Sequence, residues 1–302
     1  MERALYVSLT TAFALLASSA VSQPDAEARS PSADIQRFAD DCEPWDNWDK
    51  PAQPFRIHGT TYYVGTCGIS AILITDPEGH ILLDTGTETG AEVVAANIAA
   101  LGFDIRDVTL IGFSHEHFDH IGGIEKLREM SGAMVVSSPA AAPVLQSGVV
   151  AETDPQAGMH EPFAPTTVDF IQQSGEGMGA GDNFLVSLAT PGHSPGAMSW
   201  YWKSCDGEEC LMIVYADSLS PVSADDYRFS DHPEYLRAYR EGIARIAELD
   251  CDILLTPHPS HSKMIERAAL GRFDNGISCE DFAAGKTRDL DARLESEAGP
   301  NQ

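Results

Sequence analysis

The stretch "VTLIGFSHEHFDHIGG", residues 108–123, decides the fold of this chain. It opens with a run, residues 108–113, whose composition is typical of a buried β-strand. Three histidines and an aspartate follow within residues 115–120, and two glycines close the stretch. A histidine-rich run between a buried strand and a helix start favours a metal site over plain surface polarity. We therefore expect metal ligands where this strand ends.

The same arrangement occurs twice more along the chain. His193 follows the strand-like run 184–190, and His258 follows the run 251–256. Open α/β folds place ligand sites beyond the carboxyl ends of their strands, so the three turns are expected to share one site. Imidazole and carboxylate ligands together suit zinc with an open position for water. The pair at 115 and 117 can serve one metal and the pair at 119 and 120 another.

Apolar periodicity predicts the fold class. In the first half, strand-like runs at 81–83, 108–113 and 133–138 alternate with helical patterns at 94–101 and 124–130. The second half repeats this alternation after a long irregular section at 148–181, and includes a helix from about residue 232 to 246. We predict an α/β protein in which two sheets pack face to face with helices outside.

The N-terminal region indicates export. Residues 1–20 have an arginine near the start, an apolar run and a small-residue end, which is typical of a cleaved signal peptide. A disordered tail or a permanent anchor is the alternative, but the apolar run is short for a membrane span. Residues 21–40 are expected to form a flexible leader, and 41–302 a single domain. The mature protein is then periplasmic or secreted and does not contact a membrane.

The chain has six cysteines, an even number that suggests three disulfides in an oxidising compartment. Six cysteines allow fifteen pairings. Local sequence favours only the pair Cys205 and Cys210, because "CDGEEC" places a hairpin turn signal between two strand-like runs. The remaining pairings stay open at this point.

The formal charge of -27 excludes nucleic acid as a partner, because binding its phosphates needs clusters of lysine and arginine. The acidic residues are spread along the chain, which is typical of a solvated surface. We see no apolar repeat typical of a coiled coil and expect a monomer that acts on a small molecule.

The motifs together resemble a known family. "SHEHFDHIGG", with "PGHSPG", "ADSLS" and "TPHPS", closely resembles the metallo-β-lactamase superfamily. "HEHFDH" with "ADSLS" and "CDILLTPHPS" is similar to the third subclass of the class B β-lactamases, from about residue 41 to the C-terminus. The resemblance implies an αββα sandwich with two central mixed sheets, and two Zn²⁺ ions at one edge.

The resemblance also implies roles for single residues. The first zinc would be held by His115, His117 and His193, and the second by Asp119, His120 and His258. Ser218 and Ser220 would hold the water network and the carboxylate of the substrate; ordinary strand-end hydrogen bonding is the alternative. The implied disulfides are Cys251 to Cys279, Cys42 to Cys67 and Cys205 to Cys210.

The expected reaction is hydrolysis of the lactam amide of penicillins, cephalosporins and carbapenems by direct attack of a metal-bound hydroxide. The catalytic residues would be His115, His117 and His120, with Asp119 orienting the hydroxide. Acyl-homoserine lactonases and glyoxalase II-like thioesterases of the same superfamily are alternatives, and a periplasmic zinc-binding protein is another. In those hydrolases an aspartate at the position of Asp217 bridges the metals.

Six further positions have a role that the sequence leaves open. Asp84 can orient a ligand histidine or cap its strand, and Asp217 can lie behind the ligands or touch a metal. His160 and His261 are the histidines least expected to be ligands. Met159 and Phe163 can form one wall of the substrate groove or pack onto the body of the protein.

Overall fold

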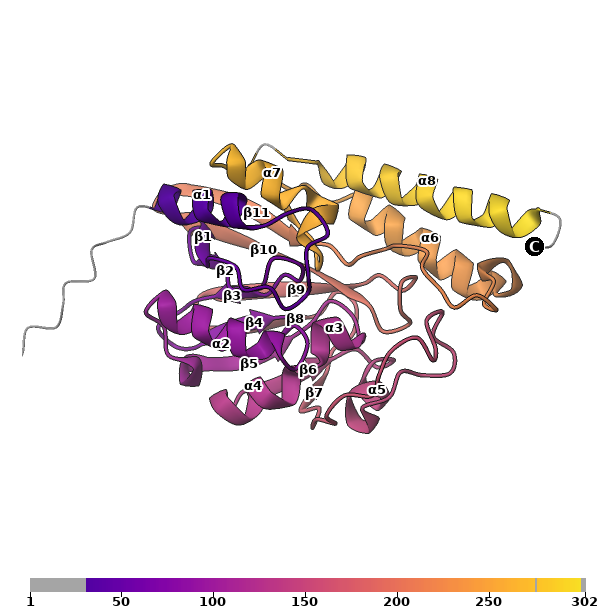
Figure 1. Ribbon diagram of the computed structural model, residues 1–302, viewed down its shortest axis with the longest axis horizontal. Helices are drawn as coiled ribbons and strands as arrows, with labels where there is room; N and C mark the ends of the chain where they lie inside the picture. The colour runs from indigo at the N-terminus through magenta and orange to yellow at the C-terminus, as the bar shows by residue number, and fades with distance from the viewer. Residues whose placement is uncertain (1–30, 275, 300–302) are drawn as a thin grey trace, which may run out of the picture.

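The computed structural model describes residues 31–274 and 276–299. Within these residues the strands form two mixed sheets, of seven and five strands (Figure 1). The first sheet consists, in order, of β1 (Phe55–His58), β2 (Thr61–Tyr63), β3 (Ile72–Ile74), β4 (His80–Leu83), β5 (Val108–Gly112), β6 (Met134–Ser137) and β7 (Phe170–Ile171). The second consists of β12 (Ile253–Leu255), β11 (Glu209–Tyr215), β10 (Met198–Asp206), β9 (Asn183–Ala189) and β8 (Gly177–Ala180).

Helices cover the outer face of each sheet (Figure 1). Helices α2 (Gly90–Ala100) and α4 (Ile124–Ser131) pack on the first sheet, and α6 (Pro233–Ala247) and α8 (Cys279–Ala298) pack on the second. The shorter helices are α3 (Phe118–Ile121), α5 (Ala142–Ser147) and α7 (Met264–Ala269). The expected αββα sandwich is therefore confirmed.

Central strands are buried on both faces, which explains their continuous apolar sequences. In β4, Ile81 and Leu83 belong to the core between the sheets, whereas Leu82 faces the core under α2 and α4. In β11, Ile213 lies between the sheets and Val214 faces α6 and α8. Successive side chains of a strand point to opposite faces, so one short strand supplies two of the three cores.

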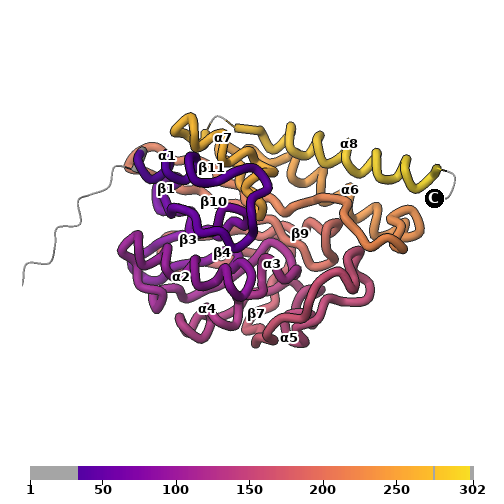
Figure 2. Tube along the Cα trace, viewed as in Figure 1, coloured from indigo at the N-terminus to yellow at the C-terminus, as the bar shows by residue number. Residues whose placement is uncertain are grey.

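The N-terminal boundary of the domain differs from the expected one. Helix α1 (Pro31–Asp41) begins within the expected leader and contributes Ile35 and Phe38 to the core between the sheets. It contacts α7 at the end of the sandwich where both helices lie in Figure 2. Ile35, Phe38 and the partly buried Ala39 lie at helical spacing, a local signal that the composition-based boundary at residue 40 overlooked. The expected signal peptide, residues 1–20, lies outside the described residues.

All six cysteines lie in the described part of the chain and are paired as the resemblance implied. Cys205 and Cys210 close the hairpin between β10 and β11, and Cys42 joins Cys67. Cys251, just before β12, joins Cys279 at the start of α8. The last of these bonds ties the long C-terminal helix to the strand that leads into the turn bearing His258.

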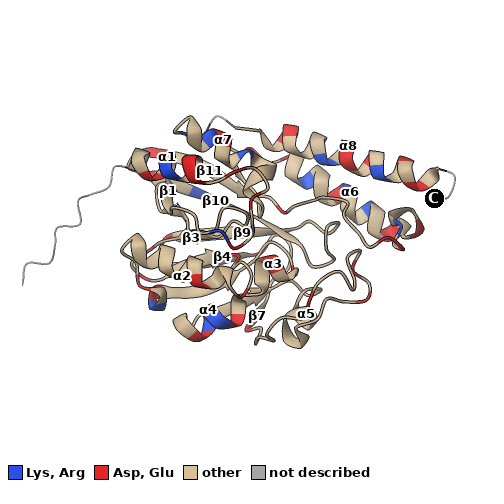
Figure 3. Ribbon diagram, viewed as in Figure 1, with Lys and Arg blue, Asp and Glu red and all other residues tan. Residues whose placement is uncertain are grey.

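Acidic residues are distributed over helices and loops and do not gather in one segment (Figure 3). Along α6 and α8 they alternate with basic ones (Figure 3). This distribution agrees with the expectation of a solvated acidic surface. None of the helices within residues 31–274 and 276–299 has the length and apolar character needed to span a membrane.

Candidate metal centre

The opening motif forms a loop and one helical turn directly after β5. His115 and His117 lie in the extended loop, where residues two apart project to the same side. Asp119 and His120 lie in the single turn of α3, which His117 precedes with an extended backbone. All four side chains are almost completely buried. The spacing of the motif thus directs four polar side chains into one interior space.

The two glycines of the motif bring α2 against this turn. A side chain at Gly123 would place its Cβ atom 2.4 Å from the Cβ of Ala91 in α2. A side chain at Gly122 would lie 2.4 Å from the carbonyl oxygen of Phe118. Only glycine permits both close approaches, so the Gly-Gly pair has a packing role beside the ligand residues.

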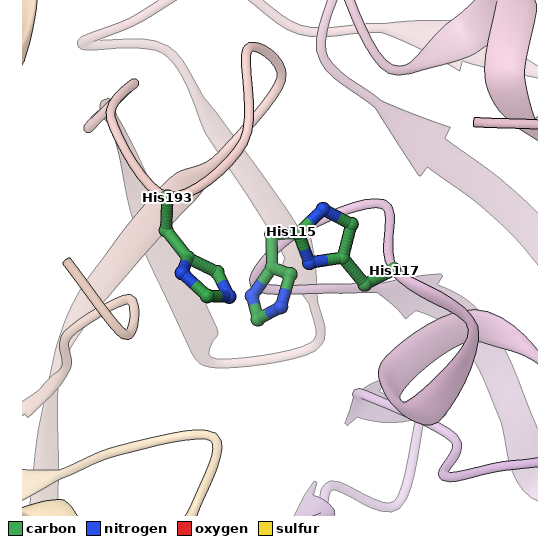
Figure 4. A group of neighbouring side chains, drawn as sticks. All are labelled: His115, His117 and His193. Carbon is green, nitrogen blue, oxygen red and sulfur yellow. The ribbon is translucent and has the colours of Figure 1, made fainter. Parts of the chain in front are cut away.

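Three histidines meet in a first group. His193, from the loop between β9 and β10, points toward His115 and His117 (Figure 4). One ligand nitrogen from each ring lies within 4.8 Å of the others. The three ring centroids are 4.6 to 4.9 Å apart. Three imidazoles at this separation can bind one metal ion and leave a fourth coordination position open.

A second group lies beside the first. Asp119 and His120 have ligand atoms within 4.8 Å of each other and of His115. His258, in the turn after β12, places Nε2 3.5 Å from Asp119 Oδ2, and its ring centroid is 5.0 Å from that of His120. The structure therefore brings together all six residues expected to hold metal.

Each of the five histidines has one ring nitrogen occupied by a partner outside the two groups. The pairs are His115 Nδ1 with Asp217 at 2.8 Å, His117 Nε2 with Asp154 at 3.2 Å, His120 Nδ1 with Asp84 at 3.2 Å, His193 Nδ1 with the Ser220 carbonyl at 2.9 Å, and His258 Nδ1 with the Gly68 carbonyl at 3.2 Å. Such partners fix the tautomer of a metal-binding histidine and raise its basicity.

The remaining ring nitrogens fit a metal ion. Nε2 of His115 and Nε2 of His120 are buried and have no hydrogen-bond partner among the described residues. Leaving a buried polar atom without a partner is costly, and a metal ion satisfies both atoms. Burial lowers the pKa of His115 and of His193 well below the usual range, which favours the neutral imidazole that binds metal.

The carboxylates around the histidines point to bound cations as well. Asp84, Glu116, Asp119, Asp154 and Asp217 are all buried. Within the described residues no lysine or arginine forms an ion pair with any of them. Each of them contacts a histidine or accepts a hydrogen bond, so together they place negative charge around the imidazoles, which a divalent metal ion would offset. The residues present therefore fit a centre that holds divalent metal ions.

Asp84 is placed to orient the ligand His120, which is one of the two roles that the sequence suggested for it. Besides His120, its carboxylate accepts hydrogen bonds from Ser114, through both the backbone N–H and the hydroxyl, and from the Tyr215 hydroxyl. Asp84 has φ of 62°, a left-handed conformation that is strained for a residue with a side chain. The hydrogen bonds around its carboxylate hold this strained residue at the end of β4.

Asp217 lies behind the ligands. Its Oδ1 contacts His115 Nδ1, and its Oδ2 accepts the backbone N–H of Leu219. Burial raises the pKa of Asp217 to about 7. Asp217 is absent from both metal-binding groups formed within the described residues. Asp217 therefore contacts Nδ1 of His115 and leaves Nε2 of the same ring free to bind a metal ion.

Sequence reasoning missed several residues at this centre. Asp154, which holds His117, lies in the irregular section and has no local signal that separates it from other surface acids. Gln156 contacts His193 and His160. Glu116 lies inside the motif itself, where a charged residue between two buried ligands is a signal that could have been used.

The remaining expected residues occupy varied positions. Ser218 Oγ is buried and has no hydrogen-bond partner among the described residues, whereas Ser220 is partly exposed. His261 packs against Trp45 and is not in either ligand group within the described chain. Met159 is exposed, but Phe163 packs onto the core under α2 and α4, so Phe163 belongs to the body of the protein.

Comparison with known proteins agrees with this geometry. Residues 64–207 match the family described as the metallo-β-lactamase superfamily. The chain is 26% identical over 227 residues to the probable metallo-hydrolase YflN of Bacillus subtilis (strain 168), a match that covers 67% of this chain and 83% of that protein.

Solved structures give closer matches. The metallo-β-lactamase MIM-2 is 51% identical, with a TM-score of 0.83 over 87% of this chain and 98% of that one. MIM-1 from Novosphingobium pentaromativorans is 43% identical, with a TM-score of 0.84 over the same shares. MEM-A1, a subclass B3 enzyme from a soil metagenome library, is 38% identical, with a TM-score of 0.80 over 83% of this chain and 99% of that one. The chain belongs to the metallo-β-lactamase superfamily, and it is similar to the subclass B3 enzymes within it.

Proposed function

We propose that this chain is an exported zinc-dependent β-lactamase that holds two zinc ions and hydrolyses the lactam amide of penicillins, cephalosporins and carbapenems. One observation carries the proposal. Two adjacent groups of ligand atoms lie beyond the strand ends, with His258 3.5 Å from Asp119 of the second, and each of the five histidines is oriented by a separate partner. Similarity to solved metallo-β-lactamases supports the substrate class.

The residues divide between two metal ions. His115, His117 and His193 would hold the first ion, and Asp119, His120 and His258 the second. Once bound, the ions supply Lewis-acid activation of the attacking water and of the lactam carbonyl. This chemistry needs no serine or lysine nucleophile in the chain.

The protein's own groups then orient the reaction. Asp84, Asp154 and Asp217 hold three ligand rings in one tautomer each, so the ligand nitrogens are already arranged before substrate binds. Asp119 has its carboxylate between His120 and His258, where it can accept a hydrogen bond from the attacking water. Ser220, beside His193, can donate a hydrogen bond to the substrate's carboxylate.

A lactonase or thioesterase is the main alternative within the superfamily. It would need Asp217 to bridge the two metals. The contact between Asp217 Oδ1 and His115 Nδ1 favours the β-lactamase, because the aspartate is occupied in orienting a ligand. The three disulfides favour an oxidising compartment and so support export, with residues 1–20 as the signal peptide and a monomeric mature domain.

The test is a substrate panel with the purified, zinc-loaded mature protein. The panel contains a penicillin, a carbapenem, an acyl-homoserine lactone and a glutathione thioester, each assayed with and without a chelator. We expect hydrolysis of the lactams that the chelator abolishes and added zinc restores. Hydrolysis of the lactone or thioester alone would favour the alternative enzymes. Zinc binding without any turnover would favour a zinc-binding protein.

A further inference from the structure

A buried lysine outside the ligand groups lies next to the metal centre. Lys286 belongs to α8 on the outer face of the second sheet, yet only 6% of it is exposed. Its ammonium donates a hydrogen bond to Ser220 Oγ at 3.0 Å and lies 5.2 Å from the ring centre of Phe282. Within the described residues no carboxylate forms an ion pair with Lys286. A buried cation without an anionic partner calls for an explanation.

Ser220 connects this lysine to the metal centre. Its carbonyl accepts the Nδ1–H of His193, and its hydroxyl oxygen accepts the Lys286 ammonium. Ser220 is partly exposed while Lys286 behind it is buried, so the open side of the hydroxyl is available to a ligand. A single residue therefore lies between a ligand histidine and a positive charge.

The Ser220 hydroxyl is free to turn toward such a ligand. Its own proton reaches only the Ser218 carbonyl, at 3.2 Å, which is long for a bond between a hydroxyl and an oxygen. Because Lys286 donates to the oxygen, the hydroxyl proton has to point away from the lysine. An acceptor on the open side can take this proton at little cost.

We propose that Lys286 is a positioning residue for an anionic substrate: it polarises and orients the Ser220 hydroxyl, and its charge attracts the substrate's carboxylate. The proposal rests on the proposed function, since the carboxylate belongs to a β-lactam. Burial lowers the pKa of Lys286 to about 8, which leaves the ammonium largely protonated at pH 7. In a chain with a formal charge of -27, a buried cation beside Ser220 offsets the repulsion that an anionic substrate meets there.

The experiment compares Lys286→Met with the parent enzyme on benzylpenicillin and on its neutral methyl ester. We expect KM for the acid to rise about tenfold, the usual size of a charge-assisted hydrogen bond, and kcat to stay within about twofold. KM for the ester should be unchanged, because the ester carries no charge. Lys286→Arg keeps the positive charge, so its KM for the acid should stay close to that of the parent enzyme.

The matched control is Lys263→Met, which removes an exposed positive charge from the turn before α7 and does not touch Ser220. It should leave both KM values unchanged. Zinc content and circular dichroism of all variants report whether the centre and the fold are intact. If Lys286→Met does not fold, Lys286→Gln is used in its place.

Two results would overturn the proposal: an unchanged KM for the acid, or an equal rise for acid and ester. If the parent enzyme does not turn over benzylpenicillin, the proposed function fails on its own. The affinity of the same variants for the intact acid and for the ester is then measured by calorimetry. A loss of affinity in Lys286→Met for the acid but not for the ester supports the role of Lys286. A protein that binds neither compound overturns the proposal too.

Discussion

Glu116 offers a test of how this protein assembles its metal centre from two separate loops. The side chain is buried between the ligands His115 and His117. Its Oε1 accepts the backbone N–H of Gly196 at 2.6 Å, and its Oε2 accepts the hydroxyl of Ser194. Because both donors follow His193 in the chain, the carboxylate joins the loop after β5 to the loop between β9 and β10.

Glu116→Gln keeps the shape of the side chain but replaces one acceptor oxygen by an amide that can only donate. The amide oxygen can still accept the Gly196 N–H, but the amide nitrogen can only donate to Ser194, whose hydroxyl has to turn from donor to acceptor. Both bonds to Glu116 then lose their charged acceptor. A hydrogen bond to a charged acceptor contributes about 1.5 to 3 kcal/mol. Without this free energy, zinc binding itself has to hold the His193 loop in place. We therefore expect the first zinc to bind roughly 10- to 100-fold more weakly, the size expected for an outer partner of a metal site.

The assay is a zinc titration in competition with a chromophoric chelator, with metal content measured on the same samples. The control is Glu92→Gln, because Glu92 is an exposed glutamate of α2 whose carboxylate pairs with Lys126, away from the ligand groups. We expect normal zinc affinity for the control and one weakened site for Glu116→Gln. Equal affinities for Glu116→Gln and the parent protein would refute the argument that this carboxylate holds the two loops in register.

Two more predictions concern the second metal and the disulfides. His120→Ala should lose the second zinc and most of the activity, because it removes a ligand of the second group. The control His232→Ala changes an exposed histidine and should still bind two zinc ions, as measured by metal content. Full activity of His120→Ala would contradict the ligand assignment. Cys251→Ser with Cys279→Ser should lower the free energy of unfolding by about 3.5 kcal/mol, because the bond joins residues 28 apart. Cys205→Ser with Cys210→Ser should cost about 2 kcal/mol, because those residues are only 5 apart. Urea unfolding measures both values, and equal losses would contradict the loop-length argument.

Local periodicity predicted most of the sandwich. Apolar runs indicated the positions of the strands β4, β5 and β12 and of the helices α2, α4 and α6. They could do so because apolar residues repeat every 3.6 residues on the buried face of a helix and form short continuous runs in a strand buried on both faces. Helix α8 gave no such signal. Over its 20 residues it buries few large apolar side chains, chiefly Phe282 and Leu290, and its other inward contacts include the lysine at 286.

The ligand residues could be named from the sequence because they are concentrated in a motif and at two strand ends. The groups that orient them could not. Asp154 lies 37 residues from His117, and Asp217 lies 102 residues from His115. An acidic residue in a loop looks the same in the sequence whether it faces solvent or a ligand ring. Only packing of the loops distinguishes the two.

The sequence by itself determined which chemistry the site contains, because histidines and an aspartate spaced after buried strands have few other uses. The alternation of strand and helix patterns also predicted two sheets packed face to face with helices outside, and the family resemblance implied the αββα sandwich. The tertiary structure alone decided which nitrogen of each histidine is free, that Asp217 orients His115, and that Lys286 reaches Ser220 across 66 residues. These features depend on distances of a few ångströms between distant segments, which only the assembled cores establish.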